Sequence, residues 1–190
     1  MLFTAILVMT ATLPAGLAAE SSQGTPAAPA DAAAIKQFED AIAKYVALRE
    51  ALIVEKIPGP VPNSSAPEVN RASDALAAAI QRARQKAQPG DVFVAPVAPV
   101  LKRRIVDAVR KENLGPVLAD IDDELKSAVT PTVHLRFPVA APMATMPPSL
   151  LAVLPPLPKS LEYRIVGKYL VLRDVEAALI IDFIAAAVPR

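Results

Sequence analysis

Few side chains in this chain of 190 residues could bind a metal ion or transfer protons. Its single histidine, His134, is of the residue type most often used as a metal ligand or general base. It lies on the polar phase of the alternating stretch Thr132 to Pro138, and the sequence contains no cysteine and no second histidine. We therefore interpret His134 as a surface residue of a strand and keep it as a weak candidate for metal binding.

The densest acidic cluster falls in a short helix predicted from Val117 to Ser127. Asp120 and Glu124 would share one face of that helix, because residues four apart lie above one another. Asp122 and Asp123 complete the cluster, but its spacing is not that of a calcium-binding loop. We expect a solvated helix face, with Asp120 and Glu124 as weak candidates for a cation site.

Basic side chains gather on a helix that is predicted to begin near Pro99. They are Lys102, Arg103, Arg104, Arg110 and Lys111. No aromatic residue is interleaved with them, and the net charge of the chain is only +1. Both observations argue against nucleic-acid binding as the main task. We expect this face to pair with the acidic helix or to remain solvated, and contact with anionic lipid headgroups or an acidic partner is the alternative.

The sequence contains no recognisable catalytic motif. A nucleophile elbow, a phosphate-binding loop, a dinucleotide fingerprint and a zinc-binding HExxH sequence are all missing. The absence of cysteine also excludes disulfides and cysteine-based zinc sites. Two carboxylates that meet across a cleft would remain compatible with the sequence. We predict no catalytic residue, no cofactor and no enzymatic activity.

The clearest strand pattern runs from Leu161 to Ile184. Apolar and charged residues alternate at its start, which is typical of a half-buried strand. Gly167 and Lys168 are predicted to form a two-residue type II′ turn. That turn places Glu162 opposite Arg173, and we expect a cross-strand ion pair on the solvent-facing side of the sheet.

A third strand is predicted to complete an antiparallel meander. A second turn from Asp174 to Ala178 leads into apolar residues that alternate around Asp182. Before it, seven prolines fall between Pro138 and Pro158, and proline lacks the amide hydrogen that sheets and helix interiors need. We therefore expect an extended surface segment there, with one helical turn near residues 149–153.

The residues from 31 to 128 are predicted to be helical, which with the meander gives an α+β fold. Asp31 is a plausible N-cap for a helix that ends near Lys56, and Pro67 is suited to the first position of the next. The two helices are expected to pack antiparallel. Arg49 and Arg84 are assigned to exposed faces, and Asp40 with Lys44 to an ion pair. Residues 129–190 would belong to the same domain as the helices.

The N-terminal residues 1–19 have the features of a signal peptide. An apolar run breaks at Pro14, and small residues follow that would permit cleavage after Ala18 or Ala19. The run is shorter than the roughly 20 apolar residues of a membrane span. No basic residue precedes it, so the signal is atypical or the true start lies upstream; a buried helix is the alternative. A flexible linker is predicted over residues 20–30.

The stretch from Met143 to Ile184 resembles an uncharacterised family of exported bacterial proteins. These combine a signal peptide, a variable helical middle, a TMPP segment and a tail close to LEYRxVGxxLxLxDxxAxLIxDFI. The meander alone also resembles the closing hairpin of RcnB-type periplasmic nickel/cobalt-homeostasis proteins. Family members usually have Asn or Gly near Ala178, whereas this chain has Ala177 and Ala178. The resemblance implies an exported protein of this architecture, but no reaction.

We therefore predict an exported, periplasmic or envelope-associated protein without enzymatic activity. It would act through protein–protein contacts or as a structural or assembly factor, with a protein partner in the envelope that the sequence does not identify. After signal cleavage we expect no stable membrane span. The alternative is a periplasmic metal- or small-ligand-binding protein. A metal site would bring carboxylates to His134, whereas a partner-binding protein would expose an apolar patch or a strand edge.

Overall fold

The computed structural model describes residues 29–56, 65–124, 130–136 and 146–189, apart from the side chains of 55, 56 and 121–124. The predicted signal peptide and most of the predicted linker lie outside these ranges. Helices precede a three-stranded antiparallel sheet, so the fold is α+β. The elements are α1 (Pro29–Lys56), α2 (Ala66–Ala83), α3 (Val97–Lys111), α4 (Gly115–Glu124), α5 (Pro148–Leu151), β1 (Leu161–Val166), β2 (Tyr169–Asp174) and β3 (Leu179–Ile184).

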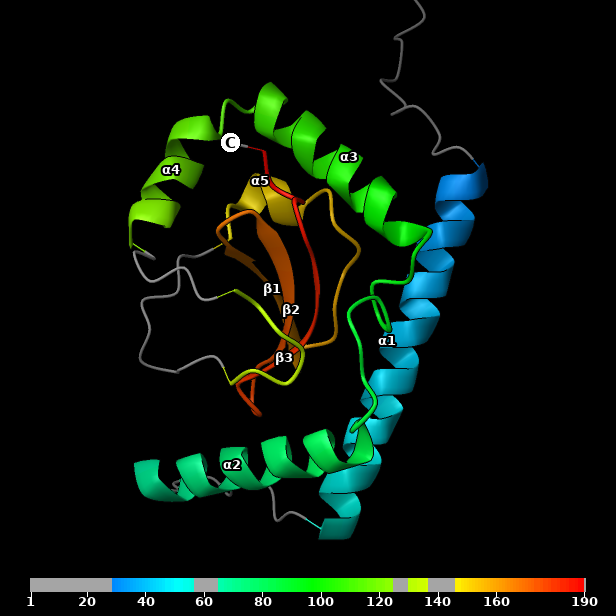
Figure 1. Cartoon of the computed structure of the whole chain (residues 1–190), viewed down its shortest axis with the longest axis vertical. Coiled ribbons are helices and arrows are strands. Elements are labelled where there is room, and N and C mark those ends of the chain that lie inside the picture. The colour runs from blue at the N-terminus through cyan, green and yellow to red at the C-terminus, as the bar shows by residue number, and fades with distance from the viewer. Residues whose placement is uncertain (1–28, 57–64, 125–129, 137–145, 190) are drawn as a thin grey trace, which may run out of the picture.

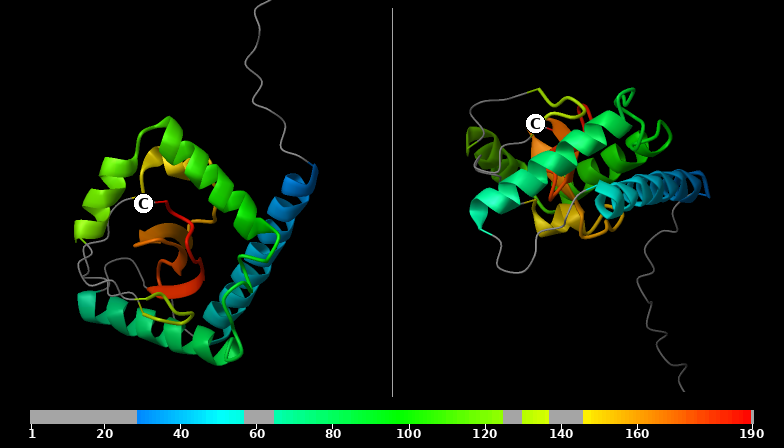
Figure 2. Two further views of the ribbon diagram at one scale, coloured as in Figure 1. Left: turned by 45° about the horizontal axis from the view of Figure 1, so that its top comes forward. Right: turned by 90° about the horizontal axis from the view of Figure 1, so that it is seen from below.

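The four longer helices form a frame around the sheet, and the short helix α5 lies close to it (Figures 1 and 2). The helices α1 and α2 meet at a steep angle near their ends, so the prediction of an antiparallel pair is wrong. The contacts of α2 explain the difference. Gln81 donates a hydrogen bond to the carbonyl of His134, and Arg136 forms an ion pair with Asp74, so α2 lies over the segment 130–136 rather than along α1.

Several helix boundaries differ from the predicted ones because of local capping. Asp31 is not an N-cap: it lies in the first turn of α1, where it pairs with Arg103 of α3 at 2.6 Å. The helix α3 ends where Asn113 adopts a φ of +49° and Leu114 donates to the carbonyl of Val109, as in a Schellman motif. The helix that was predicted from Val117 begins two residues earlier, at Gly115, since proline is tolerated in a first turn.

The hairpin of β1 and β2 has the register that was predicted from the sequence. Val166 lies opposite Tyr169, so Gly167 and Lys168 are the two loop residues. Gly167 has a φ of +57° and Lys168 a negative φ, the combination that a type II′ turn requires. The pairing of β2 with β3 shifts by one residue between Leu172, which lies opposite Asp182, and Arg173, which lies opposite Ile180. This bulge breaks the simple alternation that was predicted for the third strand.

Both faces of the sheet are buried. One face contributes to the main core with α1, α2 and α3, and the other carries a smaller apolar cluster of Val166, Val171 and Ile180. The segment 130–136 runs beside β3, where the amide of His134 donates to the carbonyl of Ile180, and its Leu135 packs on this cluster. The expected solvent-facing side is therefore wrong: Arg173 is buried and Glu162 is only partly exposed.

The segment around His134 is not the predicted strand over its described part. His134 has a φ of +70°, which turns the chain, and one isolated bridge joins Arg136 to Leu179. The proline-rich segment also differs from the surface path that was expected. It contains α5 close to the predicted helical turn, but Met146, Leu150 and Leu154 are buried in the main core.

Two buried aspartates tie the sheet to the helical part of the chain. The carboxylate of Asp182 accepts hydrogen bonds from the amides of Gly90, Val92 and Phe93, at 2.8 to 2.9 Å for the shortest contact of each. The carboxylate of Asp174 accepts hydrogen bonds at 2.8 Å from the Tyr45 hydroxyl and from Nε of Arg49.

Arg49 is therefore buried in the core instead of lying on an exposed helix face. The expected pair of Asp40 with Lys44 is replaced by one between Asp40 and Lys36. Among the described residues, no helix combines the length and the hydropathy needed to cross a bilayer.

Candidate functional site

A strap of the chain, Pro155 to Pro158, separates two hollows with largely apolar walls. The first hollow, of about 340 Å³, lies between the strap and β1. The second, of about 520 Å³, lies between the strap and α1. Pro156 lines both, so the two hollows meet at this exposed residue. We name the pair the strap hollows.

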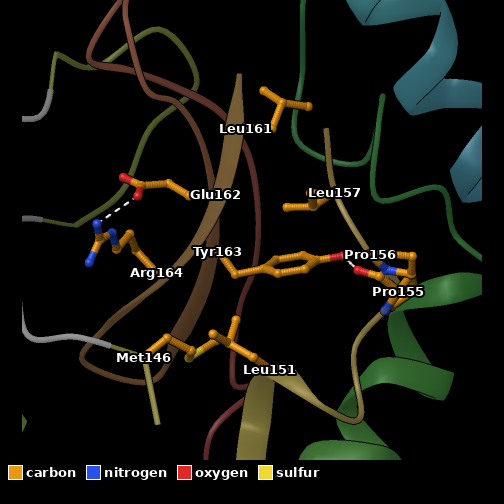
Figure 3. A pocket seen from close by; sticks show the side chains of 9 residues that line it. All are labelled: Met146, Leu151, Pro155, Pro156, Leu157, Leu161, Glu162, Tyr163 and Arg164. Carbon is orange, nitrogen blue, oxygen red and sulfur yellow. Dashed lines mark hydrogen bonds and ion pairs between the residues drawn. The ribbon is translucent and has the colours of Figure 1, made fainter. Parts of the chain in front are cut away.

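The hollow beside β1 has apolar walls and a charged rim (Figure 3). Figure 3 shows Tyr163 reaching across the hollow to Pro155, whose carbonyl accepts its hydroxyl at 3.0 Å. Burial raises the pKa of Tyr163, so the hydroxyl remains a donor at neutral pH. Leu151 lies exposed on the wall formed by α5. The walls of this hollow therefore suit apolar groups, and its tyrosine stays protonated at neutral pH.

At the rim of the same hollow, Glu162 accepts hydrogen bonds from two arginines. Nη2 of Arg164 lies 2.6 Å and Nη1 of Arg173 lies 2.5 Å from the carboxylate oxygens. Burial alone would raise the pKa of Glu162, but these bonds outweigh burial and lower it. A carboxylate held in its ionised form by two cations is a poor general acid, and the arrangement is that of a structural ion pair.

The hollow beside α1 combines an apolar floor with an acidic rim. Phe38, Ile42 and Val46 form the floor together with the prolines of the strap. Glu39 and Glu50 are both exposed, and neither forms an ion pair with any described residue. They are eleven residues apart on one helix, which corresponds to about 16 Å along its axis. The rim therefore presents two separated negative charges on either side of an apolar surface.

The weak metal candidates do not form a metal site in the part of the chain that the structure describes. Burial, followed by the charge of Arg84, lowers the pKa of His134, and its Nε2 is buried without a described partner. Asp120 is exposed on α4, and the side chain of Glu124 lies outside the described residues. No group of three or more His, Asp or Glu side chains there could hold an ion. His134 is half-buried at a turn, so its interpretation as a surface strand residue is wrong.

The basic residues of α3 find different partners from those expected. Arg103 pairs with Asp31 of α1, and Arg104 donates to the carbonyl of Val153 at 3.3 Å. Arg110 and Lys111 are exposed at the end of the helix. The acidic side chains of α4 that were expected to pair with this face, apart from Asp120, lie outside the described residues.

Of the residues that line the strap hollows, only Glu162 was singled out from the sequence, and there as one half of an ion pair. A signal was present: Ala43, Ala47 and Val54 are exposed on α1, so apolar residues occur on both sides of this helix. Such a pattern indicates a second contact surface for a helix of this length. For the strap itself the sequence contained no such signal, because proline content does not indicate which side of a segment remains open.

Comparison with family models, with curated proteins and with solved structures finds no match for this chain. The resemblance of residues 143–184 to exported bacterial proteins, and of the meander to the RcnB type, therefore stays a prediction.

Proposed function

We propose that this protein is an exported, periplasmic or envelope-associated protein that acts by binding another protein through the strap hollows. The observation that carries the proposal is the pair of largely apolar hollows that meet at the exposed Pro156. Concave apolar surfaces with a charged rim are typical of sites that receive apolar side chains of a partner. The predicted signal peptide over residues 1–19 supports the location.

The rim defines the chemistry of the partner. Glu39 and Glu50 carry negative charges at the two ends of the hollow beside α1, and in the described residues no cation neutralises them. A partner segment with an apolar centre and a basic residue near each end would complement both features. Because the charges are exposed, they would contribute to the rate of association and to specificity more than to affinity.

The location is tested by fractionating cells that produce the full chain. We expect the mature protein in the periplasmic or envelope fraction, with an N-terminus at Ala19 or Glu20 as read by N-terminal sequencing. Recovery of the chain in the cytoplasm with Met1 retained would contradict export.

Binding is tested by introducing a photo-crosslinking amino acid at Ala43, inside the hollow beside α1, and at Ala33, which is exposed on the same helix outside it. We expect a defined crosslinked partner from Ala43 only. The variant Ala47→Glu should abolish that crosslink, whereas Ala33→Glu should retain it. Equal crosslinking from both positions, or survival in Ala47→Glu, would argue against these hollows as the binding site.

The alternative proposal is binding of a metal ion or small ligand. It predicts a thermal shift of the purified mature chain with nickel or cobalt ions that His134→Gln removes. Such a result, without a protein crosslink at Ala43, would favour the alternative.

A further inference from the structure

A third hollow, of about 560 Å³, lies on the other side of α1 and shares no residue with the strap hollows. Its polar walls come from α1, from the residue that follows α2, and from the loop before α3. We name it the Arg84 hollow. Its lining includes Gln37, Lys44, Tyr45, Arg84, Val92 and Val94.

Arg84 is a largely buried cation, and most of its N–H donors have no short contact with a described residue. Its side chain is 11% exposed, and its guanidinium lies over the ring of Tyr45, with 5.3 Å between Cζ and the ring centroid. Within the described residues its guanidinium donates one hydrogen bond, 3.4 Å long, to the carbonyl of Ile181, and its nearest carboxylate, that of Asp91, lies at 3.9 Å. An arginine has five N–H donors, so most of those on Arg84 have no short contact with a described residue.

Lys44 supplies a second cation to the same hollow. It is exposed on α1 and forms no ion pair with any described residue, because the neighbouring Asp40 is paired with Lys36. Two acids, Asp40 and Asp91, also line the hollow; Asp40 is the partner of Lys36, and the carboxylate of Asp91 accepts the amide of Gln88 at 3.0 Å. The two cations therefore face two carboxylates, each of which already has another partner: Lys36 for Asp40 and the amide of Gln88 for Asp91.

The remaining walls of the hollow are suited to an apolar group. Val92 is buried and Val94 half-buried in the loop that Asp182 fixes, and both line the hollow. The amide side chain of Gln37 could accept or donate at the edge. Because the loop is fixed by buried hydrogen bonds, the distance between its apolar wall and Arg84 is set before any ligand arrives.

We infer that the Arg84 hollow binds a small organic anion, with its carboxylate or phosphate between Arg84 and Lys44 and its apolar part against Val92 and Val94. Charge-assisted hydrogen bonds from a guanidinium fit the planar oxygens of either group. The cation–π contact with Tyr45 holds the guanidinium in place, so little side-chain freedom is lost on binding. This inference does not depend on the proposed protein-binding function.

The test is calorimetric titration of the full mature chain with three probes. Benzoate carries the charge and an apolar ring, benzamide has the same shape without the charge, and inorganic phosphate has the charge alone. We expect benzoate to bind and benzamide not to bind, with phosphate weaker than benzoate. Binding of phosphate more tightly than benzoate would assign the site to phosphorylated ligands and overturn the role of the apolar wall.

Variants locate the site. Lys44→Gln removes a cation without a described ion-pair partner and should weaken benzoate binding by at least about tenfold, the effect of one lost charge-assisted bond. Arg84→Gln should abolish binding, and its thermal melt would show whether it folds. Arg82→Gln is the matched control, because Arg82 is exposed one residue before the end of α2 and does not line the hollow. Equal affinities of Lys44→Gln, Arg82→Gln and the unchanged protein, or no benzoate binding at all, would overturn the inference.

Discussion

Replacing Arg49 by methionine tests whether the ion pair between α1 and the sheet stabilises the fold. The side chain of Arg49 is 7% exposed and that of Asp174 is 0% exposed, and Nε and the carboxylate are 2.8 Å apart. Methionine fills much of the same space without the charge. Asp174 would then remain buried with the hydroxyl of Tyr45 and the amide of Ala177 as partners.

The expected cost follows from that remaining set. Removing one partner of a buried ion pair costs about 3–5 kcal/mol, because the other charge is left without compensation. Two donors still bind Asp174, so we expect the lower end of this range, about 3 kcal/mol of unfolding free energy. The double variant Arg49→Met with Asp174→Asn should lose less than the sum of the single variants, because neither charge is then left alone.

Urea unfolding followed by circular dichroism measures these free energies, with the slope against urea expected to remain unchanged. The control is Glu176→Gln. Glu176 also pairs with Arg49, but its side chain is 55% exposed, so we expect a loss below about 1 kcal/mol. If Arg49→Met cost no more than this control, the buried pair would not be a major support of the fold.

Three further predictions concern the backbone, the single histidine and the strap. Ala186 is exposed with a φ of +49°, so Ala186→Gly should raise the unfolding free energy by about 1 kcal/mol, whereas Ala185→Gly, exposed without a positive φ, should lower it. Burial lowers the pKa of His134, so its contribution to stability is complete above its unfolded pKa of 6.5 and is lost as the pH falls below that value. The unfolding free energy, measured by chemical unfolding, should therefore decline as the pH is lowered through 6.5, and His134→Gln should reduce that decline. Tyr163→Phe removes the bond to Pro155 and should cost about 1 kcal/mol, measured by thermal melting, with an unchanged melt contradicting it.

The register of β1 and β2 could be predicted from the sequence because all the residues that determine it are close together in the chain. Gly167 fixes the turn, and the turn fixes which residues face each other, including Glu162 and Arg173. Whether that face meets solvent is a different question. It depends on the segment 130–136, which lies more than twenty residues earlier in the chain and which the alternating pattern around His134 presented as an ordinary strand.

Buried charges were the main reason for wrong side-chain assignments. A helical pattern places Arg49 and Arg84 on polar faces, because it assumes that charged residues seek water. Arg49 is buried because the carboxylate of Asp174, 125 residues away, accepts a hydrogen bond from its Nε. The site residues were missed for a related reason: the open side of the strap depends on how Pro156 lies against α1 and β1, which no local pattern encodes.

The hydrogen bonds of Asp182 and Asp174 give the order in which this fold can be completed. Those that reach the helical part of the chain join residues between 89 and 129 positions apart, and in each of them the carboxylate is the later partner. During synthesis, which starts at the N-terminus, the helices are therefore made long before the two carboxylates that hold them to the sheet. Contacts of such separation form slowly. Until the last strand has emerged, the hydrogen bonds of Asp182 to the loop before α3 cannot form, and this part of the core stays open.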